Sequence, residues 1–514
     1  MRSIPLSLSL SLTRRRASLL LAALAAGLPR AGALAAPADA DRWGPPRPFS
    51  WDILIDRTRR LARHPYTPPR PSTSAVSDWD GFVRLSYGAA DAMTGTVRLF
   101  PTRRDVAPYA VAMHVVGGGV ARALRDTHGL FGAGGSADVA GWRVLDPNGM
   151  TDWMAFLGAS YFRCSGTANR YGLSTRGVAV DTGLPGAEEF PAFTGFWIEQ
   201  RGADRVVVHA LLDGPSLSGV YAIDTVRQAD GTNVQDVRCA LFPRRDIQRL
   251  GIAPQTSMFL YDQTRASGLP GAPTLGDWRP EVHDSDGLAI RTGAGERIWR
   301  PLHNPTQARM HAFRADHPRA FGLMQRDRHF SHYEDDSLYY ERRPSLWMEP
   351  LGDWGAGSVM LYEMASISET VDNIGAFWVA DQPVRAGQRR DYAYRLTWTT
   401  ADPSVDANAH CTNVFIGPLN PEGLPAAPDA CKYVIDFSGP VLAPAGACDG
   451  VRAVTDLPAS AVIALHAQPL GGQAASCRVV LDLRLRGLAR REFRLFLQRG
   501  ADALSETVIL TLEP

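Results

Sequence analysis

The chain has 514 residues, of which 45% are hydrophobic and 21% are charged, and its formal net charge is +1. This length exceeds one ordinary core and predicts two or more domains, while the composition argues against long disorder. The near-zero charge excludes a global basic field that attracts nucleic acid or anionic lipid, so no nucleic-acid partner is expected.

Residues 1–36 predict an export signal. Three arginines at 14–16 precede an apolar run over 19–28, and the segment ends in Ala-x-Ala at Ala33 and Ala35. The run is too short to span a bilayer. Because adjacent arginines are typical of twin-arginine export, we expect this route and a mature protein outside the cytoplasm.

One amphipathic helix is expected at the start of the mature chain, in "FSWDILIDRTRRLARHPY". Ser50 can cap its start and Pro65 ends it, while Ile53, Leu54 and Leu61 supply an apolar side. From about residue 86 the pattern changes to short apolar runs such as "GTVRLF", "RVVVHALLDG" and "SVMLYEM". Such runs, separated by Gly, Pro, Asp and Asn, predict an all-β protein built as large sandwiches.

A composition break near residues 396–410 predicts a second domain. The sequence after this break is rich in Ala and Pro and contains strand-like runs such as "CRVVLDLRL" and "REFRLFLQR". Its size suits an immunoglobulin-like sandwich. We therefore expect a β-sandwich domain over 37–396, a linker over 397–408 and an immunoglobulin-like domain over 409–514.

Four of the six cysteines fall in this second domain, at Cys411, Cys431, Cys448 and Cys477. Four cysteines in an exported small domain predict two disulfides, with three possible pairings. Their spacing does not resemble a zinc site.

The stretch "EVHDSDGL" concentrates chemistry, with His283, Asp284 and Asp286 side by side. It lacks the ligand spacing of an EF-hand, and no second histidine stands at zinc-binding spacing. We therefore expect no metal and no cofactor. A solvated loop and a sugar-cutting carboxylate remain as alternatives at this point.

Residues 325–354 interleave carboxylates and arginines with Trp and Tyr. Aromatic side chains and fork-shaped donors suit a polyol, and glycosidic bonds are cut by paired carboxyl groups. A salt-bridged surface loop is the competing interpretation for most of these charges. Glu369, Asp372 and Asn373 form a further polar group before an apolar strand, although Asp-Asn is also ordinary turn chemistry.

Ten blocks carry a resemblance, in chain order: "FLGASYFR", "YGLSTRGVAVDTG", "EEFPAF", "ALLDGPSLSGVYAI", "GIAPQTSMFL", "RPEVHDSDGL", "GERIWRPLHNP", "FGLMQRDRHFSHYED", "RRPSLWMEP" and "ETVDNIGAFW". Together they resemble the OpgG/OpgD family of periplasmic glucan biosynthesis proteins, and the leader resembles the D branch more. The resemblance implies a large galactose-mutarotase-like β-sandwich followed by an immunoglobulin-like sandwich. It also implies a periplasmic protein with a long cleft for β-1,2-glucan.

The resemblance further implies an inverting glycoside hydrolase, with Asp372 as general acid and Asp284 as general base. The expected substrate-binding residues are His283, Asp286, Arg326, Tyr333, Asp335, Arg343, Trp347, Glu349 and Trp354. Two alternatives stay open, a β-1,2-glucan transglycosylase and a non-catalytic glucan-binding partner of a membrane glucan synthase. Gly375 departs from the family pattern, where a β-branched residue is expected, and predicts a looser strand behind Asp372.

Overall fold

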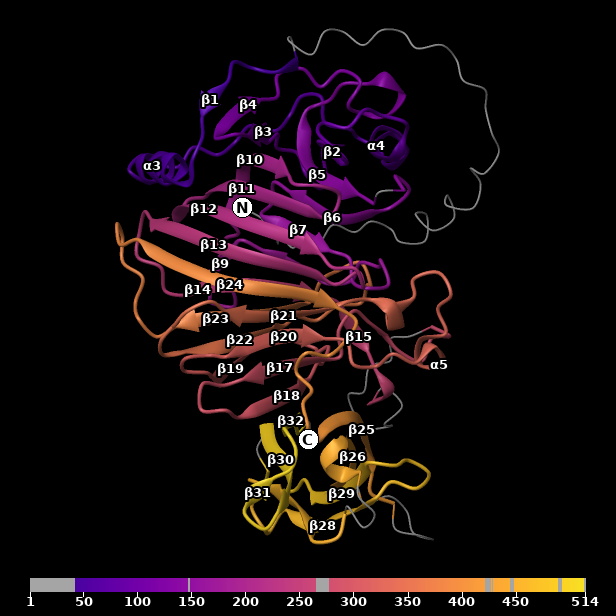
Figure 1. Cartoon of the computed structure of the whole chain (residues 1–514). Helices are drawn as coiled ribbons and strands as arrows, with labels where there is room; N and C mark the ends of the chain where they lie inside the picture. Colours follow the sequence, from indigo (N-terminus) through magenta and orange to yellow (C-terminus); the bar gives the residue numbers. More distant parts are fainter. Residues whose placement is uncertain are drawn as a thin grey trace.

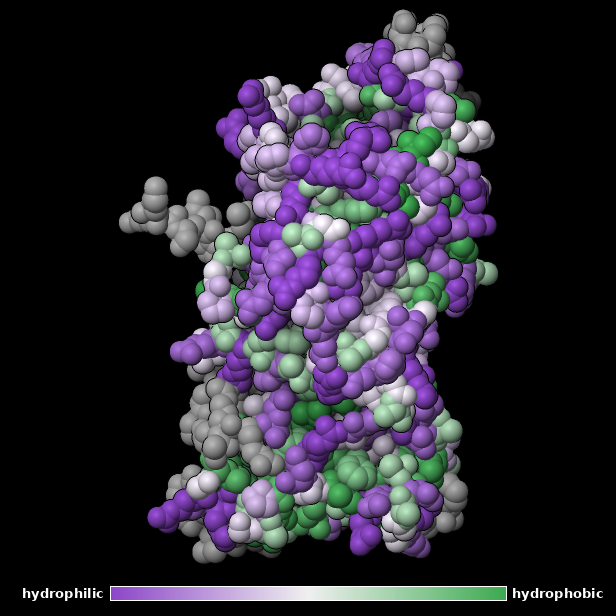
Figure 2. Space-filling model, turned by 90° about the vertical axis from the view of Figure 1, so that its left-hand side faces the viewer, coloured by the Kyte–Doolittle hydropathy of each residue, from purple (hydrophilic) through white to green (hydrophobic). Residues whose placement is uncertain are grey.

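The computed structural model describes residues 42–512, except 147, 265–276, 421–426, 428, 444–447 and 489–491. The predicted export signal lies outside the described residues. The fold is nearly all β, as expected, with sheets stacked in a sandwich-like architecture (Figure 1). Figure 2 shows one long side of the molecule, on which hydrophilic side chains predominate over the sandwich.

One layer is a ten-stranded sheet. Its strands are, in spatial order, β19 (Arg309–Arg314), β22 (Gly357–Glu363), β23 (Ile374–Ala380), β14 (Leu250–Ser257), β8 (Ser174–Arg176), β7 (Tyr161–Cys164), β6 (Asp152–Leu157), β5 (Val139–Leu145) and β2 (Val97–Pro101), with β9 (Val178–Val180) paired to β14. Successive side chains along each strand point alternately to the inner face, toward the core, and to the outer face.

The other layer is a sixteen-stranded sheet. Its strands are, in spatial order, β1 (Arg47–Pro48), β4 (Val120–Ala123), β3 (Ala112–Gly117), β10 (Ala192–Gln200), β11 (Arg205–Asp213), β12 (Leu217–Arg227), β13 (Asn233–Pro243), β24 (Arg390–Thr399), β21 (Ser345–Pro350), β20 (Ala320–Met324), β17 (Gly287–Arg291), β18 (Arg297–Pro301), β32 (Thr507–Thr511), β30 (Glu492–Arg499) and β27 (Val451–Thr455), with β31 (Asp502–Ala503) paired to β30. Strand β24 extends past the predicted start of the linker.

The main core lies between these two sheets. Trp142, Trp153, Trp378 and Trp398 are fully buried in it, and inward-facing aliphatic side chains of both layers surround them. Burial of such large apolar surfaces is the dominant favourable contribution to folding. The sandwich is therefore a rigid support for side chains on its outer faces.

The predicted N-terminal helix is confirmed as α3 (Trp51–Ala62). Ser50 caps it, since its side chain accepts a hydrogen bond from the Ile53 N–H. The helix packs on the sixteen-stranded sheet through Leu54 and Ile55. A second helix, α4 (Trp79–Tyr87), is capped by Asp78 and lies on the outer face of the ten-stranded sheet, as Figure 1 shows.

The C-terminal module (residues 409–512) adds a four-stranded sheet made of β25 (His410–Pro418), β26 (Ala430–Ser438), β29 (Ser476–Arg484) and β28 (Val462–Pro469). This sheet encloses a second core with β27, β30 and β32. Those three strands continue the sixteen-stranded sheet, because β32 pairs in parallel with β18. The module and the sandwich thus share one sheet.

The two predicted disulfides are not formed in this structure, in which Cys411, Cys431, Cys448 and Cys477 are free thiols. The four cysteines lie on strands and a turn around the second core. Cys411 and Cys477 both stand opposite Phe437, on strands that flank β26. One whole strand therefore separates these two thiols, and packing rather than cross-linking accounts for their burial.

A buried charge cluster joins the sandwich to the C-terminal module. Arg300 and Glu363 are fully buried, and Arg300 Nε lies 2.6 Å from the Glu492 carboxylate. His311 lies 3.2 Å from both Glu363 and Glu492. Burial alone lowers the pKa of His311, but the contacts with the two carboxylates outweigh burial and raise the pKa to about 9.

We expect His311→Gln to lower the free energy of unfolding by at most about 3 kcal/mol below pH 6.5. A histidine whose pKa rises on folding stabilises the protein fully below its unfolded pKa, and this contribution disappears as pH rises through about 9. Urea titrations of both proteins between pH 6 and 10 measure the difference. A difference that stays constant over this range contradicts the prediction.

Candidate functional site

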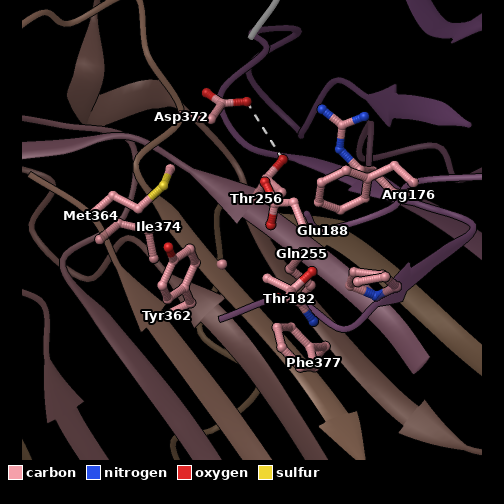
Figure 3. Close-up of a pocket in the computed structure, with 14 residues that line it drawn as sticks. Arg176, Thr182, Glu188, Gln255, Thr256, Tyr362, Met364, Asp372, Ile374 and Phe377 are labelled. Carbon is pink, nitrogen blue, oxygen red and sulfur yellow. Dashed lines mark hydrogen bonds between the residues drawn. The ribbon is translucent and has the colours of Figure 1, made fainter. Parts of the chain in front are cut away.

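Asp372 lies at the edge of a pocket on the outer face of the ten-stranded sheet (Figure 3). It is half-buried and lies two residues before the start of β23. Its Oδ2 lies 3.5 Å from the Thr256 hydroxyl, a long contact marked in the figure. The pocket is lined by Arg176, Ala179, Thr182, Glu188, Phe190, Pro254, Gln255, Thr256, Tyr362, Met364, Asp372, Ile374, Gly375 and Phe377.

Asn373 explains why Asp372 has a fixed position. Its fully buried amide donates to the carbonyl oxygens of Phe259 and Met364 at 2.9 and 3.0 Å. Its Oδ1 accepts a hydrogen bond from the Phe259 N–H at 2.9 Å. A buried amide with these partners fixes the backbone, because breaking any of these hydrogen bonds leaves a polar group unsatisfied. The adjacent carboxylate is thus held over the pocket.

Asp284 follows the short strand β16 (Val282–His283), which pairs with β15 (Phe259–Tyr261). Its side chain is fully buried and forms an ion pair with Arg343. The Ser285 hydroxyl lies 2.9 Å from that of Ser257, which is the residue after Thr256. The end of β14 thus has Asp372 on one side and the Asp284–Ser285 segment on the other.

His283 anchors a buried polar network beside Asp284. Its ring nitrogens lie 2.9 Å from Glu281 and 2.9 Å from Gln325. Gln325 Nε2 also donates to the Tyr333 hydroxyl at 2.9 Å. Burial alone lowers the pKa of His283, but Glu281 outweighs it and raises the pKa to about 9, so the ring is an imidazolium at neutral pH. Tyr333 therefore belongs to the His283 network, whereas Arg343 is the residue that contacts Asp284.

Asp286 and Asp335 shape the loops around this network. Asp286 Oδ2 accepts hydrogen bonds from the backbone N–H groups of Arg326 and Asp327, and burial raises the pKa of Asp286. Asp335 lies 3.0 Å from Arg279 Nη1, which also contacts Glu369 at 2.8 Å. These contacts tie the loop that follows β20 to the segment that carries Asp372.

The structure places four predicted substrate-binding residues outside this region. Arg326 is buried at the junction with the C-terminal module, where it contacts Asp402 and Glu506 at 2.7 and 2.6 Å. Trp347 is only 2% exposed and belongs to the second core. Both side chains therefore hold the domains together and are not exposed to a ligand.

Trp354 and Glu349 also point elsewhere. Trp354 is half-buried against Trp378, with ring centroids 5.2 Å apart, and packs on the main core. Glu349 is exposed on β21, opposite Arg395 of β24. Of the four predicted residues, Arg326 thus lies at the domain junction and Trp347 in the second core. Trp354 packs on the main core, and Glu349 is exposed.

Within the part of the chain that the structure describes, Glu281, Asp327 and His332 approach metal-binding geometry, with ligand atoms within 4.8 Å of one another. These groups already have partners, because His332 Nδ1 contacts Asp327 and Glu281 contacts His283. Each of the three side chains therefore already has a hydrogen-bonding partner within the protein.

Sequence reasoning missed several residues of the Asp372 pocket, among them Arg176, Glu188 and Tyr362. Arg176 and Glu188 come from blocks quoted for the resemblance, "YGLSTRGVAVDTG" and "EEFPAF", so their position in those blocks was the available signal. Arg279, which precedes "EVHDSDGL", was missed as the link between Asp335 and Glu369.

A family model described as "Periplasmic glucan biosynthesis protein, MdoG" matches residues 49–512. The chain belongs to the MdoG family. Glucans biosynthesis protein D 1 of Ralstonia nicotianae is 41% identical over 94% of this chain and 95% of its own length. Glucans biosynthesis protein D of Stenotrophomonas maltophilia is 38% identical over 97% of each chain. The expected family and its D branch are confirmed.

MdoG membership supports a role in glucan biosynthesis, and the family description implies the periplasm. Among the described residues, no helix is long and apolar enough to cross a membrane. A solved polysaccharide lyase aligns over 73% of this chain and 44% of its own, with a TM-score of 0.20 and 8% identity. That likeness is too weak to bear on fold or function.

Gly375 lies inside β23, paired with Thr256 on one side and Tyr362 on the other. A Cβ atom at this position has only the Tyr362 Cβ within 4 Å, at 3.8 Å. We expect Gly375→Ala to raise the free energy of unfolding by about 0.5–1 kcal/mol, because glycine weakens a strand interior. Guanidinium titration measures the change.

The matched control is Gly357→Ala in the neighbouring strand β22. A Cβ there meets the Val379 carbonyl oxygen at 2.4 Å, so this variant is expected to lose stability. If the two substitutions change the free energy of unfolding equally, the space around Gly375 does not accommodate a Cβ atom as expected.

Proposed function

We propose that this MdoG-family protein is an inverting endo-β-1,2-glucanase of the periplasm that shapes the glucan during its biosynthesis. The observation that carries the proposal is the position of two carboxylates at one strand end. Asp372 lies at a pocket, and the buried Asp284 lies beyond Ser257 and Ser285. Inverting hydrolysis needs one carboxyl group as general acid and a second as general base, and these two positions suit that division.

In the proposed reaction, Asp372 donates its proton to the glycosidic oxygen as the bond to the anomeric carbon breaks. A water attacks that carbon from the opposite face, and its proton passes to Asp284. The Arg343 guanidinium favours the ionised form of the Asp284 carboxyl, as a base requires. Because Asp284 is fully buried, the proton reaches it through hydroxyl groups between the water and the carboxylate.

The test is incubation of the purified mature protein with linear β-1,2-glucan, with products analysed by size and anomeric form. Shorter products that first appear as the α-anomer support inverting hydrolysis. Products with new β-1,2 linkages and no net gain of reducing ends indicate the transglycosylase. Binding without any change of chain length contradicts catalysis and leaves the glucan-binding partner of a membrane synthase.

A further inference from the structure

Two thiols of the C-terminal module lie close together. Cys448 stands in the turn that leads into β27, and Cys477 lies on β29. The Cys448 Sγ is 3.9 Å from the carbonyl oxygen of Ser476, the residue directly before Cys477. The Cys477 thiol also interacts with the Cys448 thiol, and both side chains pack in the second core. The two sulfur atoms are therefore neighbours.

The other two cysteines of the module have different surroundings. Strand β26 separates Cys411 from Cys477. Burial and the nearby Asp482 raise the pKa of the Cys431 thiol to about 12. A disulfide needs two sulfur atoms within bonding reach on side chains that point toward each other. Cys448 and Cys477 are the pair of the module that the structure brings together in this way.

Cys448 and Cys477 belong to different layers of the module. Strand β27, which follows Cys448, is the outermost strand of the sixteen-stranded sheet, whereas β29 belongs to the four-stranded sheet. A bond between the two side chains joins these layers and closes a loop of about 30 residues that includes β28. Such a loop restricts the unfolded chain and thereby stabilises the folded protein.

The two thiols differ in their access to solvent. Cys477 is fully buried, and burial together with the contact to Cys448 raises the pKa of its thiol. Cys448 is half-buried in its turn. Because the thiolate is the nucleophile in thiol chemistry, we expect a reagent in solution to react first with Cys448 and then with Cys477.

We propose that Cys448 and Cys477 are a site of oxidation, at which an oxidant that carries a disulfide converts the two thiols into one disulfide bond. The structure shows the pair in its reduced state. The family description implies the periplasm, where disulfides form and persist. The new bond fastens the edge strand β27 to the second layer, and no glucan takes part, so the inference is independent of the proposed function.

The reaction has two steps. The Cys448 thiolate attacks a sulfur atom of the oxidant, which forms a mixed disulfide and releases one thiol. Cys477 then loses its proton and attacks the Cys448 sulfur, which releases the second thiol. The protein gives up two protons and two electrons, and the oxidant is reduced to two thiols.

The test uses the full mature chain, purified in reductant and then incubated with oxidised glutathione at about pH 8.5, near the ordinary pKa of a cysteine thiol. Thiol titration in denaturant is expected to show the loss of two of the six thiols. Digestion without reductant, followed by mass spectrometry, is expected to yield linked peptides that carry Cys448 and Cys477. The Tm of the oxidised protein is expected to exceed that of the reduced protein by about 5 °C.

In Cys448→Ser, oxidised glutathione is expected to remove no thiol and to leave Tm unchanged, because Cys477 is buried. Cys431→Ser is the matched control within the same module, and it is expected to keep both the linked peptides and the difference in Tm between its oxidised and reduced forms. Circular dichroism confirms that each variant is folded. The inference fails if the wild-type protein retains all its thiols, if glutathione stays attached to Cys448, or if oxidation leaves Tm unchanged.

Discussion

Asp372→Asn is expected to lower kcat on linear β-1,2-glucan by about 10³-fold, the largest effect among the substitutions considered. An amide cannot donate the proton that the leaving oxygen needs, while its size and hydrogen bonding remain close to those of the acid. Asn373 holds the backbone of this segment, so the variant is expected to fold normally. Reducing-end release measures the rate, and calorimetry measures glucan affinity, which we expect to change little.

The matched control is Asp381→Asn, which changes the same residue type just after the other end of β23. Asp381 is exposed and pairs with Arg314 at 2.6 Å. Its substitution is expected to leave kcat unaltered within about twofold, since surface ion pairs contribute little. If Asp372→Asn retains more than a tenth of the wild-type rate, Asp372 is not the general acid.

Arg343→Met is expected to lower the free energy of unfolding by about 3–5 kcal/mol. The substitution takes the ion-pair partner from a fully buried carboxylate, Asp284, at a position where water cannot replace it. It also removes the contact between the guanidinium and the Tyr340 ring, whose centroid lies 3.8 Å away. Chemical denaturation at neutral pH measures the loss.

The double variant Arg343→Met, Asp284→Asn separates stability from chemistry. Neutralising both partners removes the buried charge, so part of the lost stability is expected to return. Activity is expected to be absent, because Asp284→Asn removes the proposed base. Losses that simply add in the double variant contradict a direct coupling of the two side chains.

Sequence motifs located the two carboxylates of the candidate site better than they located the residues around them. Asp284 and Asp372 stand in blocks that resemble a known family, and both lie at the end of β14 in the structure. The α3 helix was predictable because Ser50 and Pro65 are local signals. Local signals act within a few residues, so they locate helices and motifs well.

The positions of Arg326 and Trp347 could not be read in the same way. Arg326 stands next to Gln325, which belongs to the His283 network, yet its own side chain reaches Glu506 in the C-terminal module. Which neighbour points into the site depends on strand register and on a junction formed by distant parts of the chain. The predicted disulfides are not formed either, and for Cys411 and Cys477 the reason is strand β26, which lies between them.

The parallel pairing of β18 with β32 also bears on how the chain reaches its folded state. Ile298 pairs with Thr507, and Arg300 contacts Glu492 across 192 residues of sequence. Contacts of such high sequence separation require costly loop closure and slow the search for the native topology. The edge of β18 therefore stays open to strand addition until β32 docks, and the newly made chain depends on late closure to avoid aggregation.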